Sequence, residues 1–341
     1  MRRGLTAASL ALVVGVGVAA ADVSASTAQA ARPRVAVVLD PGGCPNRDTL
    51  RLCEGIEGAV RATGVPVRIV TPTFRDDLAD FLALLAQQRY GAIVVFGLYY
   101  EPAVAAVARR YPNVPFYVMD APRSHVPNAP SNVQGIVLQA REAAFLAGWL
   151  AAKLEARRPG PDVVGVVGGL KGAAGVETFV DGFTVGATRA APGAKVLVSY
   201  SNNFVDPAKC AALARRQIAQ GAGTIFNVAG ACGLGAMRAA ADAGVWAVGV
   251  DTDQAFLGPH VLTSVLKSFE AGFTEVLRQV KTGRLRRGRD TTLTMRDGAA
   301  GLGKISARVP ASLVAQLREL ERRIVTGRLR VPPLVTPSAV G

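Results

Sequence analysis

Short hydrophobic runs alternate with longer amphipathic segments along almost the whole chain. A short apolar run bounded by turn residues is typical of a buried strand, and apolar residues that recur every three or four positions are typical of a helix. The first part of the chain has runs at 34–39, 67–71, 92–96 and 115–119, separated by helical segments at 48–63, at 76–89 and ending at Arg110. This β-α alternation predicts a parallel sheet with helices on both faces.

A second set of units follows the first. Strands are predicted at 163–167, 195–200, 224–229 and 245–250, with helices at 139–154, 176–191, 207–220 and a run ending at Ala243. The two sets predict two similar doubly wound α/β lobes rather than a short-period repeat. An amphipathic helix at 311–325 and a proline-rich tail form a C-terminal segment, 311–341.

Residues 1–30 have the pattern of a secretory signal peptide. Arg2 and Arg3 form a basic start, an apolar core runs from Leu10 to Ala21, and Ala28-Gln29-Ala30 is a small-residue cleavage signature. We therefore expect an exported protein, at the extracellular face of the plasma membrane or secreted. No cysteine precedes Cys44, so no lipid anchor is expected.

The chain carries a net charge of +14, mainly from arginine, with a concentration at Arg284, Arg286, Arg287 and Arg289. Such a surface attracts an anionic envelope or nucleic acid, or it is simply solvated. No nucleic-acid motif and no interleaved aromatic residues accompany the arginines. This favours a solvated basic surface, and no nucleic-acid partner is expected.

Four cysteines remain after the signal segment, in two pairs whose members are nine and twenty-two residues apart. Neither spacing fits a zinc site, and no metal is expected. An even number of cysteines in an exported chain favours disulfides, and we predict Cys44–Cys53 and Cys210–Cys232 because each pair joins neighbouring elements. Free buried thiols are the alternative.

Polar residues follow the predicted strands at the edge where ligands of such sheets bind. Asp40, Tyr99 and Asp120 stand at strand ends in the first lobe. In the second lobe these positions hold the glycine turn around Gly230, then Asp251, and Lys267 sixteen residues later. An ionised carboxylate accepts two hydrogen bonds, which suits adjacent sugar hydroxyls, and an ammonium group nearby adds donors. Helix capping by Asp251 and a surface position for Lys267 are the alternatives.

The motifs of common enzymes are missing. The first strand is not followed by a dinucleotide fingerprint, and Gly168-Gly169-Leu170-Lys171-Gly172 lacks the Gly-Lys-Ser/Thr of a phosphate loop. His125 and His260 lie beside prolines or asparagines in loops, so no nucleophile has an evident base. We expect no catalytic residue and no cofactor.

Several short motifs together resemble the basic membrane protein family, the purine-nucleoside-binding components of ABC transporters. The first run is Gly249-Val250-Asp251-Thr252-Asp253-Gln254, followed by Leu262-Thr263-Ser264 and Lys267. Further matches are Asp40-Pro41-Gly42-Gly43, Tyr111-Pro112-Asn113-Val114, Glu142 to Gly148, Gly168-Gly169, Phe179 to Gly186 and Ala229-Gly230. The similarity covers roughly Val35 to Gly303.

This resemblance implies a type I periplasmic-binding-protein fold, with two lobes that close on a nucleoside. Three crossovers are expected near 132–137, 261–264 and 288–291, which gives lobes of 34–136 plus 264–288 and of 137–262 plus 290–310. By position, Asp40 would face the base, and Asp251 with Lys267 would hold ribose hydroxyls. The other residues expected to line the cleft are Gly43, Tyr99, Asp120 and Gly230.

The chain departs from the family at Cys44 to Leu50, where relatives carry a stacking Phe and a base-binding Asn. Tyr99 or Phe226 is expected to supply the ring instead. The sequence thus predicts a monomeric solute-binding protein, not an enzyme, that delivers a purine nucleoside or a related molecule to a membrane permease. A surface sensor or regulator of the same fold is the alternative, and an exported nucleoside or sugar hydrolase is a third.

Overall fold

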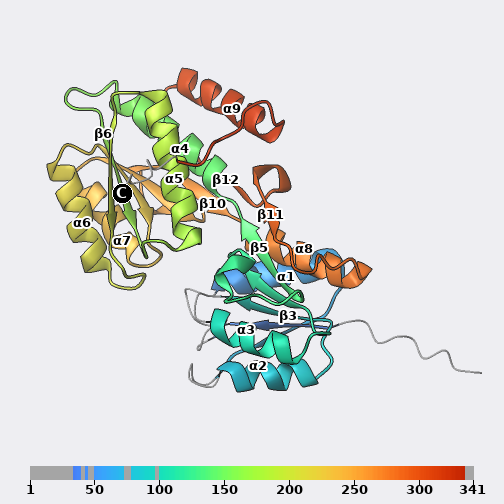
Figure 1. Ribbon diagram of the computed structural model, residues 1–341. Coiled ribbons are helices and arrows are strands. Elements are labelled where there is room, and N and C mark those ends of the chain that lie inside the picture. Colours follow the sequence, from blue (N-terminus) through green and yellow to red (C-terminus); the bar gives the residue numbers. More distant parts are fainter. Residues whose placement is uncertain (1–33, 40–42, 45–49, 73–77, 97–99, 335–341) are drawn as a thin grey trace, which may run out of the picture. The chain divides into compact units, whose positions relative to one another are not determined.

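The computed structural model describes residues 34–39, 43–44, 50–72, 78–96 and 100–334 (Figure 1). The predicted signal segment 1–30 lies outside these residues. The two α/β lobes are as predicted, and each is built around a six-stranded sheet, two strands more than the sequence pattern identified. Among the described residues, no helix combines the length and the apolarity needed to cross a bilayer.

The first sheet has the strand order β11-β5-β4-β3-β1-β2, and every pair in it is parallel. Its strands are β1 (Val35–Val38), β2 (Val67–Val70), β3 (Ala92–Phe96), β4 (Phe116–Met119), β5 (Val133–Leu138) and β11 (Thr291–Leu293). Helices α1 (Leu50–Thr63) and α8 (Phe269–Thr282) cover one face, and α2 (Leu78–Gln87) and α3 (Glu101–Arg110) cover the other. The central strands β1, β3 and β4 are buried on both sides, which explains their unbroken apolar runs.

The second sheet repeats this plan in the order β12-β10-β9-β8-β6-β7, with only β12 antiparallel to its neighbour. Its strands are β6 (Val163–Gly168), β7 (Lys195–Tyr200), β8 (Thr224–Val228), β9 (Trp246–Asp251), β10 (Val261–Lys267) and β12 (Ala300–Leu302). Helices α4 (Arg141–Glu155) and α5 (Ala174–Ala190) pack on one face, and α6 (Pro207–Ala219) and α7 (Gly233–Asp242) pack on the other.

The chain passes between the sheets three times: from β5 to α4, from β10 to α8, and from β11 through the short helix η3 (Met295–Asp297) to β12. The first two passages come later than the predicted segments, because the buried runs of β5 and β10 continue to Leu138 and Lys267. Residues 264–267 therefore belong to the second sheet. Residues 291–293, predicted for the second lobe, are the edge strand of the first sheet.

Small residues let α4 and α5 pack backbone to backbone. A Cβ atom added to Gly148 would overlap the Phe183 carbonyl, and one added to Gly186 would overlap the Phe145 carbonyl. Such close contact requires glycine at both positions. The crossing holds the rings of Phe183 and Phe226 in a stacked contact with centroids 5.0 Å apart.

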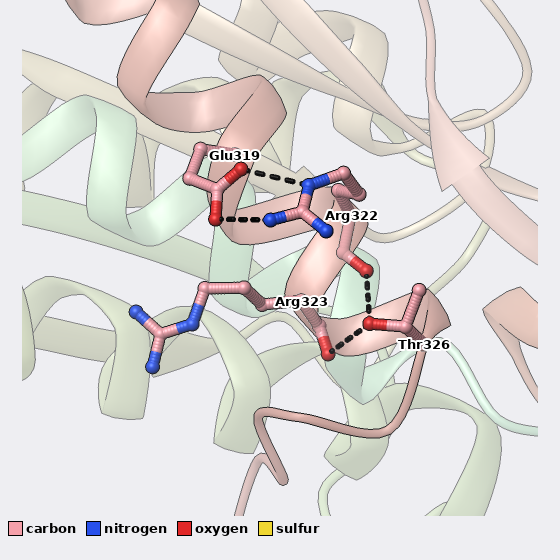
Figure 2. A network of polar contacts seen from close by, with 4 residues as sticks. All are labelled: Glu319, Arg322, Arg323 and Thr326. Carbon is pink, nitrogen blue, oxygen red and sulfur yellow. Dashed lines mark hydrogen bonds and ion pairs between the residues drawn. The ribbon is translucent and has the colours of Figure 1, made fainter.

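The C-terminal helix α9 (Ala311–Val325) has the bounds predicted from its amphipathic pattern. Leu313, Leu317 and Ile324 are buried in the core of the second lobe. On its exposed face the Arg322 guanidinium donates two hydrogen bonds to Glu319, and the Thr326 hydroxyl donates to the carbonyl of Arg322 (Figure 2).

Two disulfides join the pairs expected from the sequence, Cys44–Cys53 and Cys210–Cys232. The second links α6 to the residue just before α7, next to the Gly230 turn. Both of its cysteines are fully buried, whereas Cys44 is half-buried.

Candidate ligand-binding site

Several predicted site residues lie where strands end and their backbone is left-handed. Gly43 has φ 54°, Asp120 just after β4 has φ 62°, Gly230 after β8 has φ 55°, and Asp251 at the end of β9 has φ 63°. Glycine adopts this conformation freely, but for a non-glycine residue it is uncommon and concentrates at functional sites. The two aspartates are therefore held in place by the surrounding fold rather than by their own preference.

An ion pair joins the ends of strands from the two sheets. The Lys267 Nζ atom, at the end of β10, lies 2.9 Å from Oδ2 of Asp120, which follows β4. Both side chains are largely buried, with 4% of Lys267 and 16% of Asp120 exposed. The prediction paired Lys267 with Asp251. The structure gives Lys267 a direct bond to Asp120 and leaves Asp251 within electrostatic range of both.

The electrostatics follow from two carboxylates that share one ammonium group. Burial raises the pKa of Asp120, Lys267 opposes this rise, and the charge of Asp251 adds to it. Burial alone would lower the pKa of Lys267, but the carboxylates of Asp120 and Asp251 outweigh burial and the pKa is raised. Lys267 thus stays protonated at neutral pH. When both carboxylates are ionised, Asp120, Asp251 and Lys267 together carry one net negative charge.

The start of α5 completes the surroundings of this pair. The Lys267 ammonium lies 4.7 Å from the ring centroid of Phe179, a cation–π arrangement. A Cβ atom on Gly175 would lie 3.1 Å from Oδ2 of Asp120 and 3.6 Å from the Lys267 Nζ atom. A side chain at Gly175 would therefore crowd the ion pair.

Asp251 and Asp253 have different roles although they are two residues apart. Asp253 is structural, because its carboxylate accepts hydrogen bonds from the backbone of Ala255 and of Lys304. The Asp251 carboxylate accepts none from the described residues. The buried Gln254 stabilises this strand end: its side-chain oxygen accepts from the Val250 backbone amide, and its backbone amide donates to Ser264 Oγ. The Asp251 carboxylate therefore caps no helix among the described residues and has an acceptor available for a ligand.

Sequence reasoning missed an aromatic residue beside the glycine turn. Phe204 lies in the loop after β7, its carbonyl accepts from the Cys232 amide, and its ring packs against Gly169 so closely that a Cβ atom there would overlap it. About a third of the residue, 36%, remains exposed. The signal was available in the sequence: a lone aromatic residue in a polar loop directly after a predicted strand.

The ring substitute predicted at Phe226 is wrong. Phe226 is fully buried and packs edge-on against Phe179 and stacked against Phe183, because its strand is covered by α5. Asp40 and Tyr99 lie outside the described residues. His125 lies 3.4 Å from Glu101, the first residue of α3. The described residues contain no cluster of His, Cys, Asp or Glu arranged to hold a metal ion.

Two cavities are lined by other residues. One of about 270 Å³ is lined by Glu142, Arg296 and Arg330 beside α9, and one of about 430 Å³ lies along α8. Neither contains a strand-end residue of the candidate site. The strand ends are the better candidate, because polar side chains from separate strands converge there on a strained backbone.

Two parallel-sheet lobes and three crossovers define the type I periplasmic-binding-protein fold. Solved structures share it. A solute-binding protein of an ABC transporter system from Aeropyrum pernix K1 has a TM-score of 0.72 and 20% identity, covering 89% of this chain and 94% of that one. A transcriptional activator of the comK gene from Bacillus halodurans has a TM-score of 0.70 and 19% identity, covering 87% and 99%.

The chain belongs to the Bmp family of PnrA-like ABC transporter substrate-binding proteins, whose model matches residues 49–334. Basic membrane protein B of Borrelia garinii subsp. bavariensis is 30% identical over 247 residues, 70% of this chain and 69% of that protein. The CD4+ T-cell-stimulating antigen of Listeria innocua is 25% identical, covering 87% of each. Members of this family are exported binding proteins, not enzymes, that bind a small molecule and a permease.

Proposed function

We propose that this protein captures a nucleoside-like molecule between its two lobes and presents it, as a monomer, to the permease of an ABC importer. One observation carries the proposal: Asp251 offers a carboxylate without a hydrogen-bond donor among the described residues, beside the buried Lys267–Asp120 pair. A carboxylate of this kind binds two adjacent hydroxyl groups, as on a ribose. The excess negative charge of the three groups favours a ligand that donates hydrogen bonds there.

Phe204 supports the assignment of a base to the other end of the ligand. Its partly exposed ring lies beside the Gly230 turn, and stacking of a base on an aromatic ring contributes about 1 kcal/mol or more. In our proposal this ring replaces the missing Phe of the family motif. Asp40, Gly43 and Tyr99 would contribute from the first lobe, as expected from the resemblance.

A thermal-shift comparison of inosine, guanosine, ribose and glucose tests the ligand class. A ligand that binds the folded state stabilises it by about 2.7 kcal/mol at a hundred times its dissociation constant. We expect the nucleosides to raise the melting temperature, and Asp251→Asn to remove most of that shift. Asp242→Asn, an exposed aspartate on α7, is the matched control and should leave the shift unchanged.

Shifts by glucose but not by nucleosides would overturn the ligand class, and an unchanged shift in Asp251→Asn would overturn the role of Asp251. The importer role has its own measurement, which is stimulation of the ATPase of a partner permease by the ligand-loaded protein.

A regulator is the second candidate, because a structure with this fold is described as a transcriptional activator. A ligand that binds but never stimulates a permease would favour it.

A further inference from the structure

The edge of the first sheet opposite the candidate site is strongly cationic. The strands β1 to β5 and β11 are parallel, so they begin at this edge, and α1, α3 and α8 end there. We call these exposed cations the basal face: Arg34, Arg61, Arg68, Arg89, Arg109, Arg110, Lys281, Arg284, Arg286, Arg287 and Arg289.

Contacts between distant segments confirm that the basal face is continuous. The Lys281 ammonium donates to the Thr63 carbonyl at the end of α1, at 2.7 Å. Arg287 donates to the Pro112 carbonyl after α3, at 3.3 Å. Arg34 lies over the ring of Tyr90, with 5.4 Å between its guanidinium carbon and the ring centroid. Each of these three cations therefore contacts a segment of the first lobe that is distant in the sequence and ends at the same edge.

This charge is not neutralised within the described part of the chain. Arg61 forms an exposed contact with Glu57 at 3.8 Å, and no other cation of the basal face forms an ion pair with a described residue. Asp290 is the acidic residue next to the arginine run, but its carboxylate accepts from the amides of Arg123 and Gly135. The guanidinium groups of Arg284, Arg286 and Arg289 have no side-chain partner among the described residues.

Helix capping does not account for the whole surface. Cations in the last turn of a helix stabilise its dipole, which explains Arg61 and Lys281. Helix α8, however, ends at Gly283, a left-handed cap, and four arginines follow it. The corresponding edge of the second lobe mixes its cations with Glu155, Asp162 and Asp242. The excess of positive charge is thus larger at the edge of the first lobe.

We propose that the basal face binds the anionic phospholipid surface of a membrane. Guanidinium groups bind phosphate through two parallel hydrogen bonds, and a layer of headgroups presents phosphates over a wide, flat area. Substrate-binding proteins of this family act at a membrane. Because the basal face lies at the opposite ends of the strands from the candidate site, membrane binding leaves that site uncovered. The proposal is independent of the ligand.

Sedimentation of the protein with vesicles tests it, using phosphatidylcholine alone and phosphatidylcholine mixed with phosphatidylglycerol. The test variant changes Arg284, Arg286, Arg287 and Arg289 to Gln. The control makes the same charge change at the matching edge of the second lobe, at the exposed arginines Arg157, Arg189, Arg215 and Arg216. We expect binding only to the anionic vesicles, weakened by salt, and reduced about tenfold or more in the test variant. The control should stay close to wild type.

Equal losses in both variants would show that only net charge matters and would overturn the proposal. Equal binding to both kinds of vesicle would also overturn it. Duplex DNA provides a further arm: binding to DNA that depends on the basal face, without binding to vesicles, would assign the surface to nucleic acid instead. Thermal unfolding checks that each variant is folded. A triple variant that keeps Arg287, and so its bond to Pro112, replaces the test variant if that one unfolds.

Discussion

The Lys267 ammonium and the Asp120 carboxylate, 147 positions apart in the chain, meet at 2.9 Å between the ends of strands from two different sheets. Removing one member of a buried ion pair leaves the other charge unpaired, at a cost of about 3–5 kcal/mol. We expect Lys267→Met to lower the free energy of unfolding by about this amount, because it leaves the carboxylates of Asp120 and Asp251 without a cation.

Asp120→Asn should cost less, because Asp251 still balances Lys267. The double variant should recover part of the loss. Urea unfolding of all four proteins gives the coupling as a double-mutant cycle. Strictly additive effects would contradict a direct interaction.

Substitutions at Asp251 can separate the effect of its backbone conformation from the effect of its carboxylate. Its φ of 63° suits glycine and asparagine better than branched residues. We expect Asp251→Asn and Asp251→Gly to keep near-wild-type stability, and Asp251→Val to lose about 1–2 kcal/mol. All three should lose the nucleoside-dependent thermal shift. If Asp251→Gly bound nucleosides like wild type, the backbone rather than the carboxylate would make the site.

Glycines at the crossing of α4 and α5 should be intolerant of any side chain. Gly148→Ala and Gly186→Ala each place a methyl group against a carbonyl of the partner helix, and overpacking of this kind costs about 1–3 kcal/mol or more. Gly193→Ala is the control, because a Cβ atom there meets nothing within 4 Å. Urea unfolding should show a large loss for the first two and none for the third. A neutral Gly148→Ala would mean that the helices can separate at little cost.

Much of this fold follows from the sequence alone. Strand β7 and helix α9 have their predicted bounds, because each has a regular pattern between clear turn signals. Strand β5 was not recognised because Gln134 and Gly135 interrupt its apolar run. The structure shows why they are tolerated: Gln134 is buried and donates to Thr291 Oγ1 on β11, a partner far away in the sequence.

Local sequence patterns also allowed some residues of the candidate site to be named. Strand ends are local features, so Asp120, Gly230, Asp251 and Lys267 could be named. Which carboxylate bonds to Lys267 depends on how two sheets meet, and no local pattern contains that information. Phe226 was wrongly expected at the site: it is an aromatic residue inside an apolar strand, and it packs into the core.

The pH dependence of stability should reveal the buried Glu155. Burial raises its pKa, against the influence of Arg158 and Thr224. A carboxyl group whose pKa is higher in the folded state contributes stability below its unfolded pKa, and this contribution is lost as pH rises through the folded pKa. Glu155→Gln stays uncharged, so its unfolding free energy should rise relative to wild type as pH increases from below the ordinary glutamate pKa through the raised pKa of Glu155.

Glu319→Gln is the opposite control, because the Arg322 hydrogen bond lowers the pKa of Glu319 (Figure 2). The Glu319 contribution is present above its unfolded pKa and is lost as pH falls through the folded pKa, so this variant should approach wild type in acid. The same sign for both variants would contradict the assignment of burial as the cause at Glu155.

The two disulfides should differ in their resistance to reduction, because they differ in burial. Cys210 and Cys232 are fully buried, whereas Cys44 is half-buried. Under mild reducing conditions that keep the protein folded, we expect Cys44–Cys53 to open first, as seen by alkylation and mass spectrometry. Replacing either pair with Ala should cost about 3 kcal/mol, since both close short loops. Loss of Cys210–Cys232 should also weaken nucleoside binding, because the Cys232 amide bonds to the carbonyl of Phe204. Unchanged binding in that variant would show that the Phe204 loop is held without the disulfide.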